Sequence, residues 1–157
     1  MGQSTNGVLA YGYDLGEGFQ KIQGAGEFGE LPPLTWWDPE HDSDMIEAAE
    51  RRLLADIAGF TETWEDGHDG YFTREREAKA RLGVEFDTYC SDSYPMHLLA
   101  AKVITVYRGD CDVLDLAALA VEPEMNGWDE KLQTALRALG ITPSQDKARW
   151  LFCSYWG

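Results

Sequence analysis

Hydrophobic residues recur along this chain with two different periods, and these periods predict where helices and strands form. Apolar positions spaced by three and four residues run from residue 46 to 60 and from 128 to 139, which is the pattern of an amphipathic helix. Alternating or continuous apolar runs predict strands. The four runs of this kind lie at 7–15, 84–90, 96–108 and 148–156.

Capping and turn residues indicate where the predicted helices end. Asp42 or Ser43 can cap the first helix, and Gly59 can end it. A second helix, short and charged, is expected over 73–81, and one or two helical turns are expected over 112–119.

The order of these elements is strand, helix, helix, strand, strand, helix, strand, which predicts an α+β fold. We expect a mainly antiparallel sheet of about four strands, with about three helices packed against it. No Ser-rich or Pro-rich linker divides the chain, so residues 1–157 are expected to form a single domain. Within it, residues 16–42 are expected to be a long acidic loop and residues 84–157 a sheet-rich scaffold.

Charge is distributed unevenly along the chain. The 28 acids and 13 bases give a net charge of −15, of which residues 1–70 contribute −12 and residues 71–157 contribute −3. Direct binding to nucleic acid is not expected, because it requires Lys and Arg to neutralise phosphates. Anionic membranes are disfavoured for the same reason. This charge favours a basic protein surface as the partner.

The chain also lacks the features of a membrane or exported protein. No apolar run reaches the roughly 18 residues that a membrane span needs. The first residues carry neither a basic segment nor an apolar one, so no signal peptide is predicted. We therefore expect a cytoplasmic location. The sequence leaves the oligomeric state open.

Acidic residues gather next to a tryptophan pair just before and within the first predicted helix. A calcium site, a solvated loop with a helix cap, and an acidic docking surface are three interpretations of this cluster. The calcium-loop pattern fails, because its central glycine is absent and its twelfth position, counted from Asp38, is Ala49. The candidate partner-binding residues are Trp36, Trp37, Asp38, Glu40, Asp42, Asp44, Glu47 and Glu50. The two tryptophans are either core anchors or an exposed contact for a partner.

The three histidines give little support to catalysis. A metal-dependent hydrolase would need His41 or His68, both in acidic loops, to converge with carboxylates in a pocket. His97 lies in an apolar strand and is expected to be a hydrogen-bonded core residue. The cysteines form no CxxC motif, and no serine elbow, HExxH motif or phosphate-binding loop is present. We therefore expect no catalytic residue, no metal and no cofactor.

Several short segments at both ends of the chain resemble small uncharacterised accessory proteins of bacteriophages that infect actinomycetes. The segments are Met1-Gly-Gln-Ser-Thr-Asn-Gly7, Tyr11-Gly-Tyr-Asp-Leu15, Ser93-Tyr-Pro-Met96, Leu99-Ala-Ala-Lys102, Tyr107-Arg-Gly-Asp110, Trp128-Asp-Glu-Lys-Leu132, Leu139-Gly-Ile-Thr-Pro143, Arg149-Trp-Leu151 and Ser154-Tyr-Trp-Gly157. The group has no established activity. The resemblance therefore implies a small phage accessory protein rather than a metabolic enzyme, and it implies no catalytic residue.

Together these observations predict a non-enzymatic phage protein that docks on a basic host or phage protein. One version is a counter-defence inhibitor that occupies a nucleic-acid-binding groove as a nucleic-acid mimic, with carboxylates in place of phosphates. Two alternatives stay open at this point. The first is a structural component of the virion or of its assembly, and the second is a metal-dependent hydrolase.

Overall fold

The strands and helices follow the order that the sequence predicts, with one more helix in the second half. The structure is a computed structural model, and it describes residues 5–157. Its elements are β1 (Thr5–Gly16), the 3-10 turn η1 (Glu17–Phe19), α1 (Met45–Ala58), α2 (Tyr71–Leu82), β2 (Glu85–Ser91), β3 (Pro95–Tyr107), α3 (Leu116–Met125), α4 (Trp128–Leu139) and β4 (Arg149–Trp156). The predicted α+β class and the four-stranded, mostly antiparallel sheet are confirmed.

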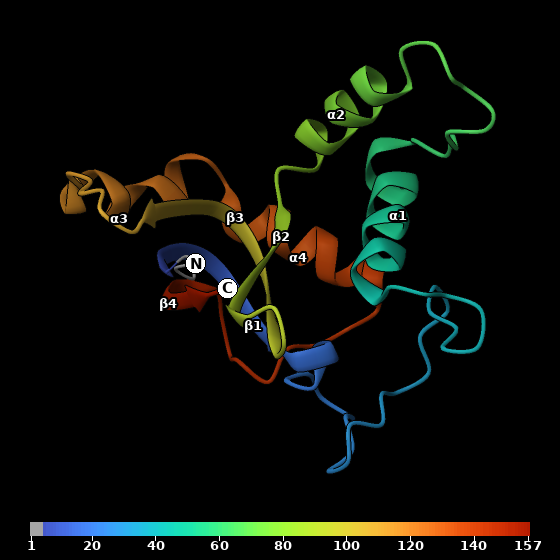
Figure 1. The fold of residues 1–157 in the computed structure, drawn as a ribbon, viewed down its shortest axis with the longest axis horizontal. Coiled ribbons are helices and arrows are strands. Elements are labelled where there is room, and N and C mark those ends of the chain that lie inside the picture. Colours follow the sequence, from blue (N-terminus) through green and yellow to red (C-terminus); the bar gives the residue numbers. More distant parts are fainter. Residues whose placement is uncertain (1–4) are drawn as a thin grey trace.

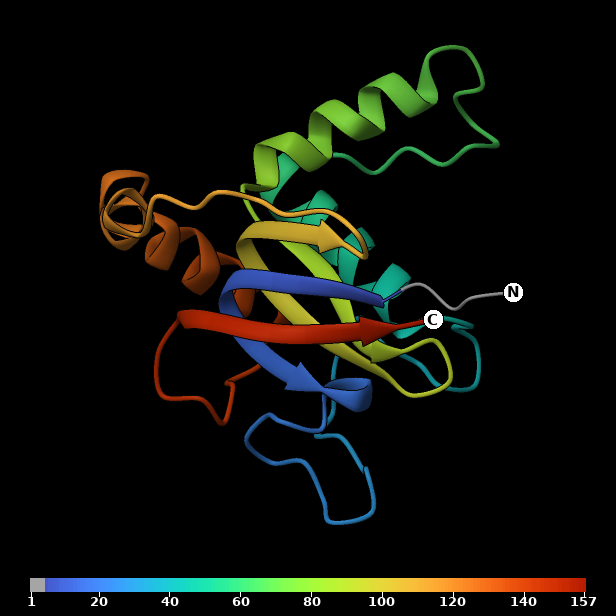
Figure 2. The same cartoon turned by 60° about the vertical axis from the view of Figure 1, so that its left-hand side comes forward.

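The four strands form one sheet that closes on itself in the order β2–β3–β1–β4 (Figure 2). Strand β1 pairs antiparallel with β3 and β4, and β2 pairs antiparallel with β3. A short parallel contact between β2 and β4, at Cys90–Tyr155 and Ser91–Trp156, completes the ring. This parallel closure was not predicted, and it gives the sheet an inner and an outer face.

Each face of the sheet buries its own hydrophobic cluster. On the outer face, Tyr11, Tyr13 and Leu15 of β1 belong to the large core shared with helices α1, α2 and α4. On the inner face, Val8 and Ala10 of β1 pack with apolar residues of β3 in a smaller cluster. Strand β1 is therefore buried on both sides, as expected for the strand between β3 and β4.

Helices α1 and α4 follow their sequence patterns closely. Helix α4 has the predicted bounds and ends at Gly140, whose φ of 64° is left-handed and suits glycine. Helix α1 is capped one or two residues later than predicted. The carboxylate of Asp44, rather than Asp42 or Ser43, accepts hydrogen bonds from the backbone N–H groups of Ile46 and Glu47 at 2.8 and 3.1 Å.

Helices α2 and α3 differ from their predicted ranges. Helix α2 begins two residues early, after Gly70 in a left-handed conformation. The turns predicted over 112–119 are wrong in extent, because Asp115 caps a helix that runs on to Met125 with Pro123 inside it. Most residues of α3 are apolar, yet only Leu119 of this helix is buried. In Figure 1, α3 lies at the opposite end of the molecule from α1 and α2.

The long segment before α1 is irregular beyond η1, and its first residues are fixed to the body. Phe19 and Ile22 are buried in the large core, and Ile22 forms an isolated bridge with Pro143. In Figure 1 the segment loops out below the sheet and then rises to the start of α1. Among residues 5–157, no helix combines the length and the apolar character needed to cross a lipid bilayer.

Candidate functional site

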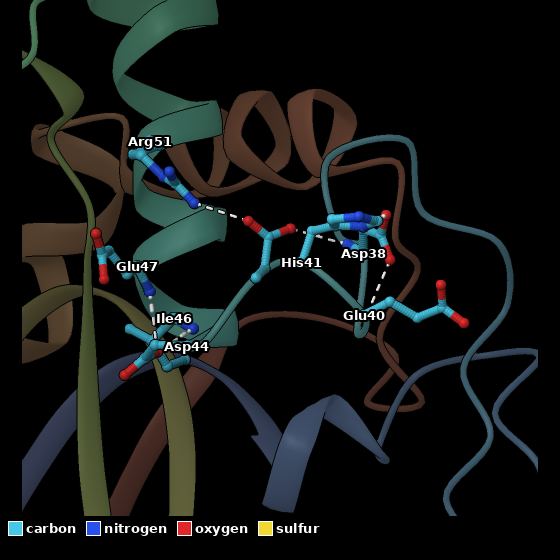
Figure 3. A network of polar contacts seen from close by, with 8 residues as sticks. Asp38, Glu40, His41, Asp44, Ile46, Glu47 and Arg51 are labelled. Atoms are coloured by element: carbon cyan, nitrogen blue, oxygen red, sulfur yellow. Dashed lines mark hydrogen bonds and ion pairs between the residues drawn. The ribbon is translucent and has the colours of Figure 1, made fainter.

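The acidic loop before α1 is shaped by its own carboxylates (Figure 3). Asp38 accepts a hydrogen bond from the backbone N–H of Glu40 at 2.9 Å, and its other oxygen lies 2.7 Å from Nδ1 of His41. Asp42 accepts from the backbone N–H of Asp38 at 2.9 Å and from Nη2 of Arg51 at 3.0 Å. These carboxylates close the turn that leads into α1.

Four of the six candidate acids have partners within the protein. Asp38 and Asp42 hold the loop, Asp44 caps α1, and Glu50 pairs with Nζ of Lys79 at 2.6 Å. Glu40 and Glu47 are exposed, and their carboxylates make no hydrogen bond or ion pair within residues 5–157. These two side chains are therefore the candidate acids most available to a partner.

The two tryptophans have different environments. Nε1 of Trp36 donates a 2.7 Å hydrogen bond to the carbonyl of Leu139, and its ring lies 6.2 Å from that of Phe19. Trp36 therefore fixes the loop to the end of α4 and to the large core. Trp37 is half-buried and makes no side-chain hydrogen bond within residues 5–157.

A second acidic segment, residues 59–70, links α1 to α2, and we call it the connector. None of its residues was among the predicted site residues. Glu62, Glu65, Asp66 and Asp69 are all exposed there, and Trp64 is 48% exposed among them. The signal that could have identified it is a single large aromatic residue among four acids within eight positions.

The connector and the two helices enclose a groove, which we call the acidic groove. Its volume is about 480 Å³. Two candidate acids of α1, Glu47 and Glu50, line it together with Glu62 of the connector and Glu75 of α2. The remaining lining residues are Arg51, Leu54, Ala55, Phe60, Thr61, Thr63, Trp64 and Tyr71. The fold therefore joins part of the predicted site to acids that lie farther along the chain.

Cations already contact part of the acidic groove. The Arg74 guanidinium binds Glu62 through Nε at 2.9 and 3.0 Å and through Nη2 at 2.7 Å, and this hydrogen bonding raises the pKa of Arg74. Lys79 lies 2.6 Å from Glu50 and 3.5 Å from Glu75. The hydrogen bond to Glu50 raises the pKa of Lys79 against the opposing effect of burial.

The excess charge of the protein lies at its surface. No charged residue is buried among those that the structure describes. Residues 38–69 hold eleven acids against only Arg51 and Arg52. This side of the molecule, from the loop before α1 to the connector, therefore carries a strongly negative field that attracts cationic groups.

The histidines do not converge on one site. His41 contacts Asp38, whereas the His68 ring lies edge-on to Trp64 at 5.2 Å. Within residues 5–157, no group of three or more His, Cys, Asp or Glu side chains is arranged to hold a metal ion. The expectation that His97 is hydrogen-bonded is wrong for Nδ1, which is buried without a partner. Burial lowers the pKa of His97, against the opposing charges of Asp44 and Glu17.

A polar cluster that the sequence did not reveal lies inside the closed sheet. Asp14 accepts hydrogen bonds from the Tyr89 hydroxyl at 2.9 Å and from Nζ of Lys21 at 2.6 Å. Burial, followed by the bond to Asp14, raises the pKa of Tyr89, and burial raises the pKa of Cys153 nearby. Because both groups are held in their protonated forms, this cluster is suited to joining strands rather than to nucleophilic chemistry.

The chain matches no family model, no curated protein and no solved structure. The candidate site therefore rests on the geometry and charge of its own residues.

Proposed function

We propose that this protein is a non-enzymatic accessory protein that binds a basic protein surface through its acidic side. The observation that carries the proposal is the acidic groove, where α1 and α2 bring acids from two separate segments around the exposed Trp64. Glu40, Glu47 and Glu65 are exposed and free of internal partners within residues 5–157, so they can contact a partner without loss of internal contacts.

The negative charge of this surface favours a positively charged protein as the partner. A field of one sign accelerates the encounter with an oppositely charged protein and repels nucleic acid. The resemblance to phage accessory proteins supports a partner of host or phage origin. A basic nucleic-acid-binding groove is one surface that would fit, since carboxylates can occupy the positions of phosphates.

Capture from the lysate of an actinomycete host tests this function. The immobilised protein is incubated with lysate at salt concentrations of about 0.1 M and about 1 M, over which the Debye length falls from about 10 to about 3 Å. The main captured protein is then identified by mass spectrometry, purified and tested for direct binding. We expect a basic protein that binds only at the lower salt concentration. An acidic or neutral partner, or binding that is independent of salt, would contradict the proposal.

The exposed helix α3 favours a second candidate function, that of a structural component of the virion or its assembly. A cluster of large exposed apolar residues on a protein surface usually marks a site of interaction with another molecule. Those on and beside α3 are Val113, Leu114, Leu116, Val121 and Met125. Mass spectrometry of purified particles tests this candidate: stoichiometric presence of the chain supports it, and absence of the chain rules it out.

A further inference from the structure

We propose that the acidic groove receives an arginine side chain of the basic partner. This inference rests on the proposed function and names the chemical group that the site recognises. It is carried by three properties of the groove: its apolar floor, its aromatic edge and its surplus of carboxylates.

The floor of the acidic groove suits the aliphatic part of a long basic side chain. Leu54, which is only 4% exposed, lines the groove together with Ala55 and Phe60. Arginine and lysine place their methylene groups along apolar surfaces while their charged ends stay near water. The volume of about 480 Å³ leaves room for one such side chain and the water around its charged end.

The edge of the groove suits a planar cation. The Trp64 ring stacks on Phe72, with ring centroids 4.9 Å apart, and lies edge-on to Tyr71 at 5.9 Å. Tyr71 in turn contacts Phe60 at 5.8 Å. These contacts hold the indole in place while about half of it stays exposed. Guanidinium groups stack on exposed indole rings of this kind.

The carboxylates around the groove outnumber the cations that contact them. Four acids line the groove, and three cations line it or contact those acids. Those acids are Glu47, Glu50, Glu62 and Glu75, and the cations are Arg51, Arg74 and Lys79. Glu65, Asp66 and Asp69 of the connector add negative charge nearby without lining the groove. Arg51 lines the groove and is also bound by Asp42, which lies outside it. The surplus attracts a further cation and opposes phosphate or carboxylate ligands.

Arginine fits this arrangement better than lysine does. Its planar group can stack on an aromatic ring and donate two parallel hydrogen bonds to one carboxylate, whereas an ammonium group acts as a compact point charge. The bond that Arg74 makes to both oxygens of Glu62 shows that this surface accommodates that geometry. Glu47, which has no internal partner within residues 5–157, is the carboxylate available to an incoming guanidinium.

Binding of short peptides to the whole protein tests the inference. Fluorescently labelled hexa-arginine, hexa-lysine and hexa-glutamate are titrated at low salt against the wild type, Trp64→Ala and Glu47→Gln. The matched controls are Phe152→Ala, which removes an exposed aromatic ring on β4, and Asp112→Asn, which removes an exposed charge beside α3. The indole N–H signal of Trp64 is followed in parallel by NMR.

We expect hexa-arginine to bind more tightly than hexa-lysine and to shift the Trp64 indole signal. We expect hexa-glutamate not to bind. Trp64→Ala should weaken hexa-arginine binding about three- to thirtyfold, the range expected for a cation over an indole ring. Glu47→Gln should weaken it about two- to fivefold, as for an exposed ion pair. Neither control should change it.

Three results would overturn the inference. If hexa-lysine binds as tightly as hexa-arginine, the preference for a guanidinium is wrong. If Trp64→Ala binds like Phe152→Ala while neutralising Glu40, Glu47 and Glu65 together still weakens binding, the groove is not the site but the acidic surface stands. If hexa-arginine does not bind at all, the inference and the proposed function both fail.

Discussion

Tyr89 donates a hydrogen bond to Asp14 over 2.9 Å, although the two residues are 75 positions apart. Asp14 lies on β1 and Tyr89 on β2, and β3 separates these two strands in the sheet. The bond therefore crosses the interior of the closed sheet rather than running along a pair of neighbouring strands. Lys21 and the backbone N–H of Gly16 complete the contacts of the Asp14 carboxylate, at 2.6 and 3.0 Å.

Removing this hydrogen bond should destabilise the fold. Tyr89→Phe keeps the ring but leaves Asp14 with fewer donors, so we expect the free energy of unfolding to fall by about 1–3 kcal/mol, as for a hydrogen bond to a charged group. Urea denaturation measures the change. The matched control is Tyr94→Phe, the same change at a tyrosine that is 66% exposed. Equal unfolding midpoints for the two variants would show that the bond contributes nothing.

The Asp44 carboxylate should act on stability through its cap rather than its charge. Asp44→Ala removes the acceptor for two N–H groups at the start of α1 and should cost about 1 kcal/mol. Asp44→Asn keeps an oxygen acceptor and should retain most of the stability. Thermal unfolding of the two variants distinguishes these roles. If Asp44→Ala and Asp44→Asn lose the same amount of stability, the charge of Asp44 rather than its capping hydrogen bonds is the cause.

Trp36 and Trp37 should respond differently to the same substitution. Trp36→Phe loses the hydrogen bond to Leu139 and part of the packing against Phe19, so a loss of about 1–2 kcal/mol is expected. Trp37→Phe should change stability by less than about 0.5 kcal/mol, since its side chain makes no hydrogen bond within residues 5–157. Chemical denaturation measures both. A larger loss of stability for Trp37→Phe than for Trp36→Phe would show that Trp37, rather than Trp36, anchors the loop.

His97 should make the protein less stable in mild acid. Burial lowers its pKa in the folded state below the ordinary value of about 6.5, so the unfolded chain binds more protons once the pH falls below that value. Stability is therefore lost as the pH falls through about 6.5 towards the folded-state pKa. His97→Phe lacks this contribution and also removes the unpaired Nδ1.

The urea midpoint of His97→Phe should consequently fall less than that of the wild type between pH about 7.5 and about 5.5. Measuring both proteins over this range separates the histidine from the carboxylates, because the carboxylates are common to both. Parallel losses in the two proteins would show that His97 does not titrate differently on unfolding.

Elements with a clear period and clear end signals were predictable from the sequence. Helix α4 carries apolar residues at helical spacing and a glycine just after its end, so its bounds were predicted correctly. Helix α3 is mostly apolar without a distinct polar face and contains Pro123, so neither its period nor its end could be identified. The burial of both faces of β1 follows from the closure of the sheet, which depends on residues 60 or more positions apart.

The candidate site was predictable only where its residues are close together in sequence. The acids from Asp38 to Glu50 could be identified as a group, but their hydrogen bonds within the loop could not. The acidic groove needs Glu62, Trp64 and Glu75, which only the packing of α2 against α1 brings to Glu47. Pairing between helices depends on side-chain packing in three dimensions, which hydrophobic spacing along one chain does not specify.

The central claim is that the acidic side of the protein binds a basic protein, and one pair of variants tests it most directly. Glu40→Gln/Glu47→Gln/Glu65→Gln neutralises three exposed carboxylates on that side, and Asp110→Asn/Asp112→Asn/Glu124→Gln neutralises three exposed carboxylates near α3. Calorimetric titration of the purified partner measures the affinity of each variant. We expect the first to bind about ten- to a hundredfold more weakly than the wild type, as for three lost charge pairs, and the second to bind like the wild type. Equal affinities for the two variants would contradict the claim.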